Sequence, residues 1–274
     1  MVKSFPERFG IIAGSKSLPM LLAKQARVLG VKRIIAVAFE GETDPGLASM
    51  VDAIEWIRVG QLSKMIACFK KHGVLECAMA GQIAPKNLFD LRPDFRALGL
   101  LLKLKEKNAH TLFTAIADEL HNEGVELISA VPFLEPLMPC SGFHLGRALS
   151  AEEKEDIVFG YRVAKEISRL EVGQIVVVKN GTVLAVEAFE GTDKCLARGG
   201  ELAGKIGGAV AVKVAKQNHD MRFDIPCIGA QTIQTCAQSG IAVLALEPGK
   251  TLLLDAAEVE ALCKKSNVVV TTAS

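Results

Sequence analysis

This chain of 274 residues has little Trp or Tyr, no excess of one charge and no membrane-length apolar run. One Trp and one Tyr argue against an aromatic platform on which bases or sugars stack. Lys and Arg number 32 against 31 Asp and Glu, so no positive excess indicates a nucleic-acid partner. The charged start of the chain also lacks the apolar core of a signal peptide.

The seven cysteines are scattered, odd in number and contain no C-x-x-C pair. That pattern predicts neither a zinc site nor a disulfide framework, and reduced thiols fit a cytoplasmic protein best. The chain is rich in apolar material, because half of its residues are hydrophobic. At this length, such a composition suffices for two modest α/β domains or one large one.

The first 130 residues predict a Rossmann-like α/β domain with a parallel sheet. Apolar runs at 9–13 and 33–38 flank a helix near whose start Pro19 lies, which makes a parallel β-α-β unit. Further strands are predicted at 53–58 and 77–80. The pairs Gly14-Ser15 and Gly81-Gln82 follow two of these strands, at the edge where open α/β sheets bind ligands. The G-x-G-x-x-G and Walker spacings are absent, so the first turn is equally well read as structural.

Three prolines, Pro132, Pro136 and Pro139, predict an irregular linker over 131–142. The second domain, 143–274, is predicted to be a catalytic α/β domain in which helices cover a mixed sheet. A capping box at Ser150–Glu153 heads a long helix to about 170, and Asn180-Gly181 predicts a hairpin. Side-chain N-caps are expected for three later helices, from Thr192 or Asp193, from Thr232 and from Asp255.

The stretch 210–229 carries the strongest chemical signal. An apolar strand interrupted by Lys213 runs directly into a loop that contains Gln217, Asp220, Arg222 and Asp224. Carboxylates suit a divalent metal and cations suit phosphate, so the mixture favours an anionic substrate with a metal. The alternative is that each of these side chains only caps backbone groups or pairs with a neighbour in water.

Residues 96–107 join a Leu-rich face to a basic one. This pattern suits contact with a membrane surface or an acyl chain. The alternative, which the pattern favours modestly, is an ordinary helix that packs on the core and has a solvated end.

Four motifs together resemble one family, the metal-dependent two-domain UDP-2,3-diacylglucosamine diphosphatases (pyrophosphatases) of lipid A biosynthesis, which are unrelated to calcineurin-like phosphoesterases. The motifs are Gly10-Ile-Ile-Ala-Gly14-Ser15 with Leu18-Pro19, Gly81-Gln82, Val186-Glu187-Ala-Phe-Glu190-Gly-Thr-Asp193, and Asp220-Met-Arg222-Phe-Asp224-Ile-Pro226 with Gly229 and Thr232. The resemblance covers essentially the whole chain. Lys16 departs from it, because a small residue is expected in that turn.

The resemblance implies hydrolysis of UDP-2,3-diacylglucosamine to 2,3-diacylglucosamine 1-phosphate (lipid X) and UMP, with water attacking the α-phosphorus. It implies Mg²⁺ or Mn²⁺ as cofactor, a site between the two domains, and a cytoplasmic enzyme at the inner face of the inner membrane of a Gram-negative bacterium. A homodimer is left open. Two alternatives remain: a nucleotide-sugar oxidoreductase or transferase, and a non-catalytic module that binds a nucleotide sugar or a lipid.

Asp224 is the first catalytic candidate, as metal ligand or as base for the water, followed by Asp220. Lys213 and Arg222 are expected to clamp phosphate. The predicted metal ligands are Asp224, Asp220, Glu187 and Asp193. The predicted substrate-binding residues are Gly14, Ser15, Gly81, Gln82, Lys86, Glu190, Gly191, Thr192, Gln217 and Thr232.

Overall fold

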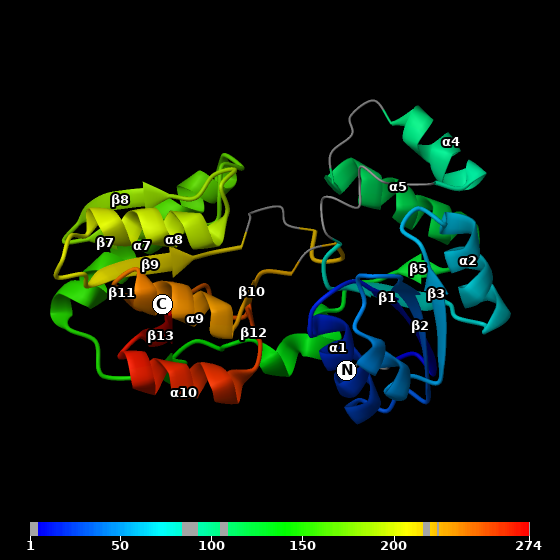
Figure 1. Ribbon diagram of the computed structural model, residues 1–274, viewed down its shortest axis with the longest axis horizontal. Coiled ribbons are helices and arrows are strands. Elements are labelled where there is room, and N and C mark those ends of the chain that lie inside the picture. Colours follow the sequence, from blue (N-terminus) through cyan, green and yellow to red (C-terminus); the bar gives the residue numbers. More distant parts are fainter. Residues whose placement is uncertain (1–4, 84–92, 105–108, 216–219, 224, 274) are drawn as a thin grey trace. The chain divides into compact units, whose positions relative to one another are not determined.

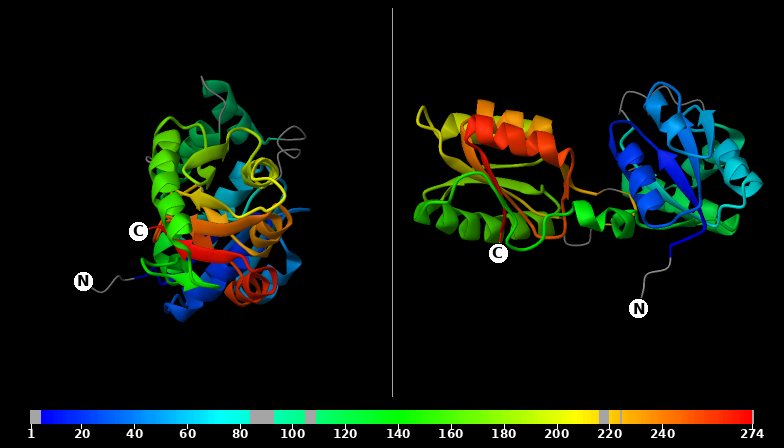
Figure 2. Two further views of the ribbon diagram at one scale, coloured as in Figure 1. Left: turned by 90° about the vertical axis from the view of Figure 1, so that its left-hand side faces the viewer. Right: turned by 90° about the horizontal axis from the view of Figure 1, so that it is seen from below.

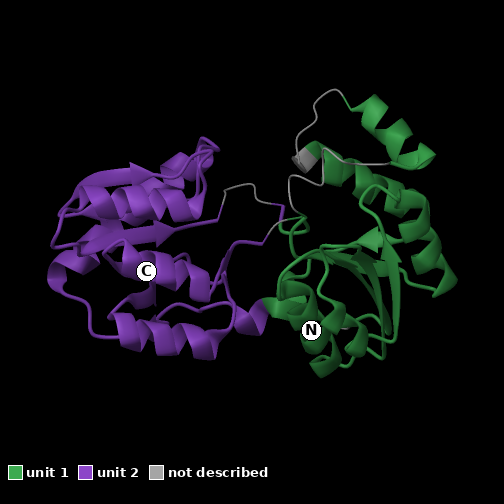
Figure 3. Ribbon diagram, in the orientation of Figure 1, with its two compact units in different colours: residues 1–134, 221–223 green, residues 135–220, 224–274 purple. Residues whose placement is uncertain are grey.

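The computed structural model describes residues 5–83, 93–104, 109–215, 220–223 and 225–273. The chain divides into two compact α/β units (Figure 1). Unit 1 comprises Met1–Leu134 and the short segment Met221–Phe223, and unit 2 comprises Glu135–Asp220 and Asp224–Ser274 (Figure 3). The chain therefore passes from unit 1 to unit 2, returns to unit 1 for the three residues Met221–Phe223, and ends in unit 2. The first passage falls inside the segment 131–142.

Unit 1 is built on a five-stranded sheet in the order β3-β2-β1-β4-β5, in which every pairing is parallel. The strands are β1 (Arg8–Ala13), β2 (Arg33–Phe39), β3 (Ala53–Ile57), β4 (Glu76–Ala80) and β5 (Glu126–Leu127). Apart from its first residue, β1 is buried along its whole length, as expected for a central parallel strand. The predicted Rossmann-like parallel sheet is confirmed.

Helices cover both faces of this sheet. The helices of unit 1 are α1 (Leu18–Val28), α2 (Leu62–Lys71), α4 (Phe95–Lys103), α5 (Ala109–Asn122) and α6 (Val131–Leu134), with a 3-10 turn at Pro45–Ser49. One core cluster joins α2 and α5 to strands β1 to β5, and Phe69 and Leu120 are fully buried in it. On β1, Phe9 stacks on Phe133 of α6, and α1 packs against β1 and α6.

The prediction that residues 131–142 form no regular element was wrong for their first half. Helix α6 occupies Val131–Leu134, and a 3-10 turn follows at Glu135–Leu137. Pro132 lies in the first turn of α6, where the missing N–H would have no partner inside the helix anyway. Proline therefore starts the helix here instead of preventing it.

Unit 2 is built on a six-stranded mixed sheet in the order β6-β13-β11-β9-β7-β8. Its strands are β6 (His144–Leu145), β7 (Ile175–Lys179), β8 (Thr182–Val186), β9 (Ala209–Lys213), β11 (Ile241–Leu246) and β13 (Val269–Thr272). The central strands β9, β11 and β13 are parallel, and the remaining pairings are antiparallel. The predicted hairpin is confirmed: Asn180 and Gly181 both have positive φ, 49° and 70°, as a two-residue type I′ turn requires.

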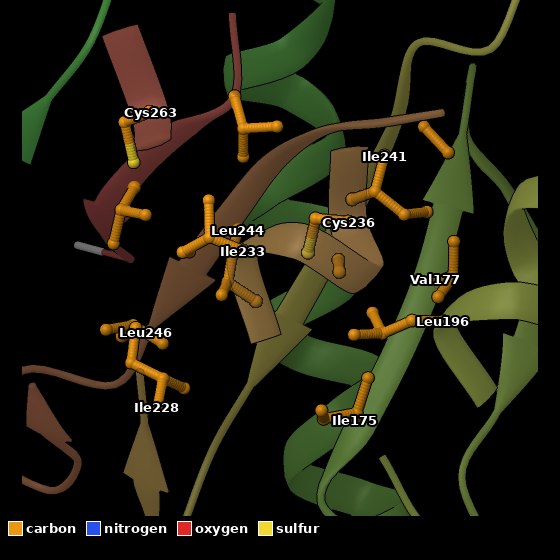
Figure 4. Packing of buried hydrophobic residues seen from close by; sticks show 14 of the residues in the cluster. Ile175, Val177, Leu196, Ile228, Ile233, Cys236, Ile241, Leu244, Leu246 and Cys263 are labelled. Carbon is orange, nitrogen blue, oxygen red and sulfur yellow. The ribbon is translucent and has the colours of Figure 1, made fainter. Parts of the chain in front are cut away.

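Unit 2 has three layers. Its helices are α7 (Ala151–Arg169), α8 (Thr192–Leu202), α9 (Ala230–Gln238) and α10 (Ala256–Ser266). Helix α7 packs on one face of the sheet, while α8, α9 and α10 pack on the other (Figure 2). Figure 4 shows that second core, in which Ile233 and Cys236 of α9 lie near Leu244 of β11. A separate parallel pair, β10 (Cys227–Ile228) with β12 (Leu252–Leu253), lies beyond the main sheet.

The N-cap predictions met mixed outcomes. The capping box of Ser150 and Glu153 is confirmed, since each side chain accepts a hydrogen bond from the backbone of the other. Thr232 is not an N-cap, because α9 already begins at Ala230 after an extended Gly229. Asp255 holds the N-cap position of α10 but in a left-handed conformation, from which its side chain makes no capping hydrogen bond.

The N-cap of α8 is Gly191, and neither Thr192 nor Asp193 takes that position. The backbone at Gly191 has a φ of 85°, which glycine adopts without a steric cost. Thr192 is the first helical residue, and its hydroxyl is engaged by the Glu187 carboxylate instead. The positive φ of this turn therefore favours glycine at the N-cap position of α8.

A close approach between backbones joins α8 to the turn that follows α9. A Cβ built on Gly200 would lie 1.8 Å from the carbonyl oxygen of Ser239. Gly99, on α4, is the opposite case, since a Cβ there would meet nothing within 4 Å. These two helical glycines therefore differ in whether the fold requires them.

Candidate active site

The two predicted glycine turns of unit 1 contact each other at the carboxyl edge of its sheet. Gly14 N donates to Ala80 O at 2.8 Å, and both the amide and the hydroxyl of Ser15 donate to Gln82 O at 2.7 Å. These bonds join the chain leaving β1 to the chain leaving β4. The structure thus brings Gly14, Ser15, Gly81 and Gln82 together.

Both glycines in this pair of turns are needed for close backbone packing. A Cβ on Gly14 would lie 2.6 Å from Gln82 O, and one on Gly81, whose φ is 88°, would lie 2.4 Å from Ser15 O. Lys16 follows with a φ of 69°, in the left-handed region that favours glycine. The departure noted at Lys16 is therefore a position where a side chain is accommodated at some conformational cost.

Asp94, which sequence reasoning missed, connects two helix starts beside this edge. Its carboxylate accepts hydrogen bonds from Ala97 N at 2.9 Å and from Ser63 N at 2.7 Å. Partial burial alone would raise the pKa of this carboxyl, but the backbone donors outweigh burial and lower the pKa. The sequence contained a helix N-cap signal, because Asp94 stands directly before Phe95, the first residue of α4.

In unit 2, Lys213 is the last residue of β9 and is 8% exposed. Its ammonium donates to Cys227 O at 3.3 Å. The neighbouring strands place Ile175 and Leu246 beside it in register. A nearly buried cation at the carboxyl edge of a parallel region is suited to an anionic group, because burial strengthens such pairing.

Glu187 lies at the same edge, directly after β8. One carboxylate oxygen accepts from Gln174 N at 2.9 Å and the other accepts from the Thr192 hydroxyl at 2.9 Å. Gly173 packs closely here, since a Cβ on it would lie 1.9 Å from Glu187 O. Glu187 therefore ties the start of β7, the end of β8 and the start of α8 together.

Glu190 lies in the turn between β8 and α8, and Asp193 is the second residue of α8. Glu190 forms an ion pair with Arg198 at 2.5 Å and also accepts from Ala188 N at 3.0 Å. The hydrogen bond from Arg198 is the main reason that the pKa of Glu190 is lowered. Asp193 accepts from the Thr235 hydroxyl of α9 at 3.5 Å. Thr232 lies in the first turn of α9.

The polar segment after β9 is divided between the units. Asp220 belongs to unit 2, whereas Arg222 belongs to unit 1 together with Phe223, over whose ring its guanidinium lies at 4.9 Å. Lys86, Gln217 and Asp224 lie outside the described residues.

Glu247, at the end of β11, is a second group that sequence reasoning missed. Its carboxylate accepts hydrogen bonds from Lys165 Nζ at 2.9 Å, from the Tyr161 hydroxyl at 3.4 Å and from Ala215 N at 2.9 Å. Burial, and then the negative charge of Glu247, raise the pKa of Tyr161. The signal for Glu247 resembled that of Lys213, because each is a charged residue at the end of a buried strand: Lys213 is the last residue of β9, and Glu247 directly follows β11.

A divalent metal would need several oxygen ligands close together. Within the described residues, no group of three or more His, Cys, Asp or Glu side chains could hold a metal ion. Glu187 already accepts two hydrogen bonds within the protein. Mg²⁺, however, is commonly held by one or two carboxylates together with substrate phosphates and water. Of the predicted carboxylate ligands, Asp220, Asp193 and Glu187 lie among the described residues, and Asp193 accepts a hydrogen bond from Thr235.

Comparison with known proteins gives matches over both halves of the chain. Residues 8–137 match the LpxI N-terminal domain, and residues 140–271 match the LpxI C-terminal domain. The UDP-2,3-diacylglucosamine pyrophosphatase LpxI of Caulobacter vibrioides is 32% identical over 258 residues, which cover 90% of this chain and 91% of the relative.

Solved structures give only weak likeness. The biotin carboxylase domain of Hydrogenobacter thermophilus 2-oxoglutarate carboxylase is 12% identical with a TM-score of 0.28, over 74% of this chain and 42% of that one. A glycinamide-RNase-transformylase T from Mycobacterium tuberculosis is 14% identical with a TM-score of 0.27, over 66% and 44%. This chain spans less than half of either structure. Among the described residues, no helix has the length and apolar character needed to cross a membrane.

Proposed function

This chain belongs to the LpxI family, and we propose that it hydrolyses UDP-2,3-diacylglucosamine to 2,3-diacylglucosamine 1-phosphate and UMP. The observation that carries the proposal is the match of both domains to this family, together with 32% identity to a named pyrophosphatase over 90% of the chain. The structure supports the proposal through Lys213, a nearly buried cation at a sheet edge, because a pyrophosphate is anionic.

In the proposed reaction, water attacks the α-phosphorus of the substrate. A bond forms between that phosphorus and the water oxygen, and the bond from the phosphorus to the bridging oxygen breaks. The bridging oxygen leaves with the sugar 1-phosphate, while the water oxygen stays with UMP. Asp224 accepts the proton of the attacking water, which is the role of a general base.

Lys213 and Arg222 neutralise the pyrophosphate in this scheme. Both are cations, and a fixed positive charge aimed at developing negative charge lowers the barrier to phosphoryl transfer. Gly14, Ser15, Gly81 and Gln82 are proposed to contact the substrate from the edge of the first sheet. Glu190, Gly191 and Thr192 are proposed to contact it from the start of α8, together with Thr232, Lys86 and Gln217.

The proposed cofactor is Mg²⁺ or Mn²⁺, held by Asp224 and Asp220, with Asp193 and Glu187 as further candidates. When bound, the ion would supply positive charge to the phosphate oxygens. Glu187 is the weakest of the four, because its two oxygens already accept hydrogen bonds from Gln174 and Thr192. Its role is better described as shaping the turn that presents Thr192 and Asp193.

Helix α4 is proposed to contact the membrane surface or the acyl chains of the substrate. Phe95, Leu98 and Leu102 lie on one helical face and are 95%, 43% and 76% exposed. The opposite face packs on the core of unit 1 through Ala97 and Leu100. An exposed apolar stripe on a helix that also carries Lys103 suits an anionic lipid surface, such as the inner face of the inner membrane.

One assay tests the proposed function. Purified protein is incubated with UDP-2,3-diacylglucosamine in Mg²⁺ or in excess EDTA, and UMP is measured. We expect UMP and the sugar 1-phosphate in equal amounts with Mg²⁺, and little of either in EDTA. Tight substrate binding without UMP release in any metal would indicate a binding module. Full turnover in EDTA, with no metal found by elemental analysis, would remove the metal from the proposal.

A further inference from the structure

We infer that Phe223 is a positioning residue, which fixes the guanidinium of its neighbour Arg222. The inference that Arg222 then acts on phosphate rests on the function proposed above. The contacts that hold Phe223 do not depend on that function, and they can be tested separately.

Unit 1 holds the residues on both sides of Arg222. On one side, Met221 O accepts a hydrogen bond from the Ser129 hydroxyl at 3.1 Å. On the other side, the ring of Phe223 packs on the core cluster of unit 1 and lies 5.7 Å from the ring of Phe113 of α5, at an interplanar angle of 33°. Aromatic pairs in this range add stability beyond the area that they bury. The backbone at Arg222 is therefore restrained from both directions.

Unit 2 holds the chain before and after this short segment. Ala215 N donates to Glu247 at 2.9 Å, and Ala215 O accepts from the Ser168 hydroxyl at 3.1 Å. On the far side, Pro226 O accepts from Leu252 N at 2.8 Å. The segment Met221–Phe223 thus lies between two fixed points of one unit and is itself fixed to the other. Packing on the core of unit 1 explains why an aromatic ring occurs in a segment that also contains Asp220 and Arg222.

The ring of Phe223 also restrains the side chain of Arg222. The guanidinium carbon lies 4.9 Å from the ring centroid, within the range of a cation–π interaction. A leucine in place of Phe223 keeps apolar packing but provides no π face. Phe223 therefore combines two tasks, since it holds the backbone through Phe113 and limits the directions of the guanidinium.

Trypsin tests the anchoring without any substrate, because it cleaves after Arg222 only when this segment opens. The rate of cleavage of the Arg222–Phe223 bond is measured by mass spectrometry in the folded full-length protein. We expect Phe223→Leu to raise this rate by about tenfold, since an aromatic pair and a cation–π contact together are of that order. Phe113→Leu removes only the partner ring and is expected to raise the rate less. Phe223→Tyr keeps the ring and is expected to restore protection.

A matched control exists on α7, where Arg162 lies 5.7 Å over the ring of Phe159. Phe159→Leu removes a similar contact elsewhere and should leave cleavage after Arg222 unchanged. Unchanged cleavage in Phe223→Leu would overturn the anchoring. If Phe223→Leu fails to fold, Phe113→Leu decides in its place, and an unchanged rate in that variant overturns the anchoring equally.

Kinetics test the second half of the inference. With UDP-2,3-diacylglucosamine, Phe223→Leu should lower kcat/KM by about tenfold with only a small decrease in Tm, and Phe223→Tyr should recover most of the kcat/KM. Full kcat/KM in a Phe223→Leu variant that trypsin cleaves faster would overturn the positioning role. Wild-type protein that shows the trypsin pattern but releases no UMP would refute the proposed function and leave the anchoring intact.

Discussion

Arg96 of α4 donates to the Glu123 carboxylate at 2.5 Å, and Lys70 of α2 donates to the other oxygen of the same carboxylate at 2.6 Å. Glu123 therefore joins α4 and α2 at the end of α5. This arrangement orients α4 with Ala97 and Leu100 on the core and Leu98 and Leu102 outward. The hydrogen bonds from Lys70 and then Arg96 lower the pKa of Glu123 from 4.5 to about 2.

The first prediction concerns the pH dependence of stability. Because the folded-state pKa of Glu123 lies below its ordinary value, its contribution is fully present above about pH 4.5 and is lost as pH falls toward 2. We expect Glu123→Gln to lower the Tm at pH 7, and the difference from wild type to shrink steadily between pH 4.5 and pH 2. Thermal unfolding followed by circular dichroism over this range measures it.

The control is Glu166→Gln, at an exposed ion pair with Arg169 on α7. Exposed pairs of this kind contribute little, so its Tm should stay near that of wild type at every pH. A Tm difference for Glu123→Gln that is constant from pH 7 to pH 2 would contradict the prediction.

The second prediction concerns the exposed stripe of α4. The double substitution Leu98→Gln with Leu102→Gln should leave the Tm nearly unchanged, because both side chains are largely outside the core. It should weaken sedimentation with phosphatidylglycerol vesicles and raise KM for the diacylated substrate several-fold. The reason is that the apolar leucine side chains that the lipid would bury are lost.

Two controls bracket that experiment. Val158→Gln removes an exposed apolar side chain from α7, 63% exposed, and should not affect vesicle binding. Leu100→Gln, on the packed face of α4, should lower the Tm instead. Equal vesicle binding by wild type and the double variant would contradict the prediction that the exposed stripe of α4 contacts lipid.

The third prediction concerns Asp224. Asp224→Asn preserves size and removes charge, so kcat should fall on the order of 100-fold while the fold survives. Measuring kcat and Tm on one preparation separates catalysis from stability. Asp255→Asn is the control, because Asp255 makes no capping hydrogen bond and asparagine accepts its φ of 52°. Near-normal turnover by a folded Asp224→Asn protein would exclude the assignment.

The fourth prediction contrasts two helical glycines. Gly200→Ala should destabilise the protein by about 1–3 kcal/mol or more, because the new Cβ would lie 1.8 Å from the Ser239 carbonyl oxygen. Gly99→Ala, in open space on α4, should stabilise it by about 0.5–1 kcal/mol through its higher helix propensity. Urea unfolding measures both, and equal effects of the two substitutions would contradict the explanation.

Local patterns predicted much of the fold. Apolar runs located the central strands because parallel strands are buried on both faces, and Ser150 with Glu153 located the start of α7. The family resemblance was carried by short motifs and is confirmed by the domain matches. N-cap positions were predicted less well. The N-caps of α8 and α9 are Gly191 and Gly229, which have no side-chain oxygen, so the backbone conformation after the preceding strand sets where each helix begins.

The sequence named individual site residues, and their roles stay predictions, but it did not indicate the contacts that support them. Glu247 looked like the end of a strand, and nothing in the local sequence indicates that Lys165 and Tyr161, some eighty positions earlier, donate to it. Phe223 looked like an incidental aromatic in a polar loop. Its contact with Phe113 spans more than a hundred positions, and a pattern confined to neighbouring residues carries no information on such pairing.

The return of Met221–Phe223 to unit 1 has a consequence for the order in which the protein can fold during synthesis. A ribosome that has made residue 134 has supplied every strand of the first sheet, yet the core beside Phe113 still lacks the ring of Phe223. That ring is added only after much of unit 2 has been synthesised, on the order of ten seconds later at typical rates of protein synthesis. A gene fragment that ends between the two domain matches, at residues 137–140, would therefore encode an N-terminal unit in which Phe113 lacks its partner ring.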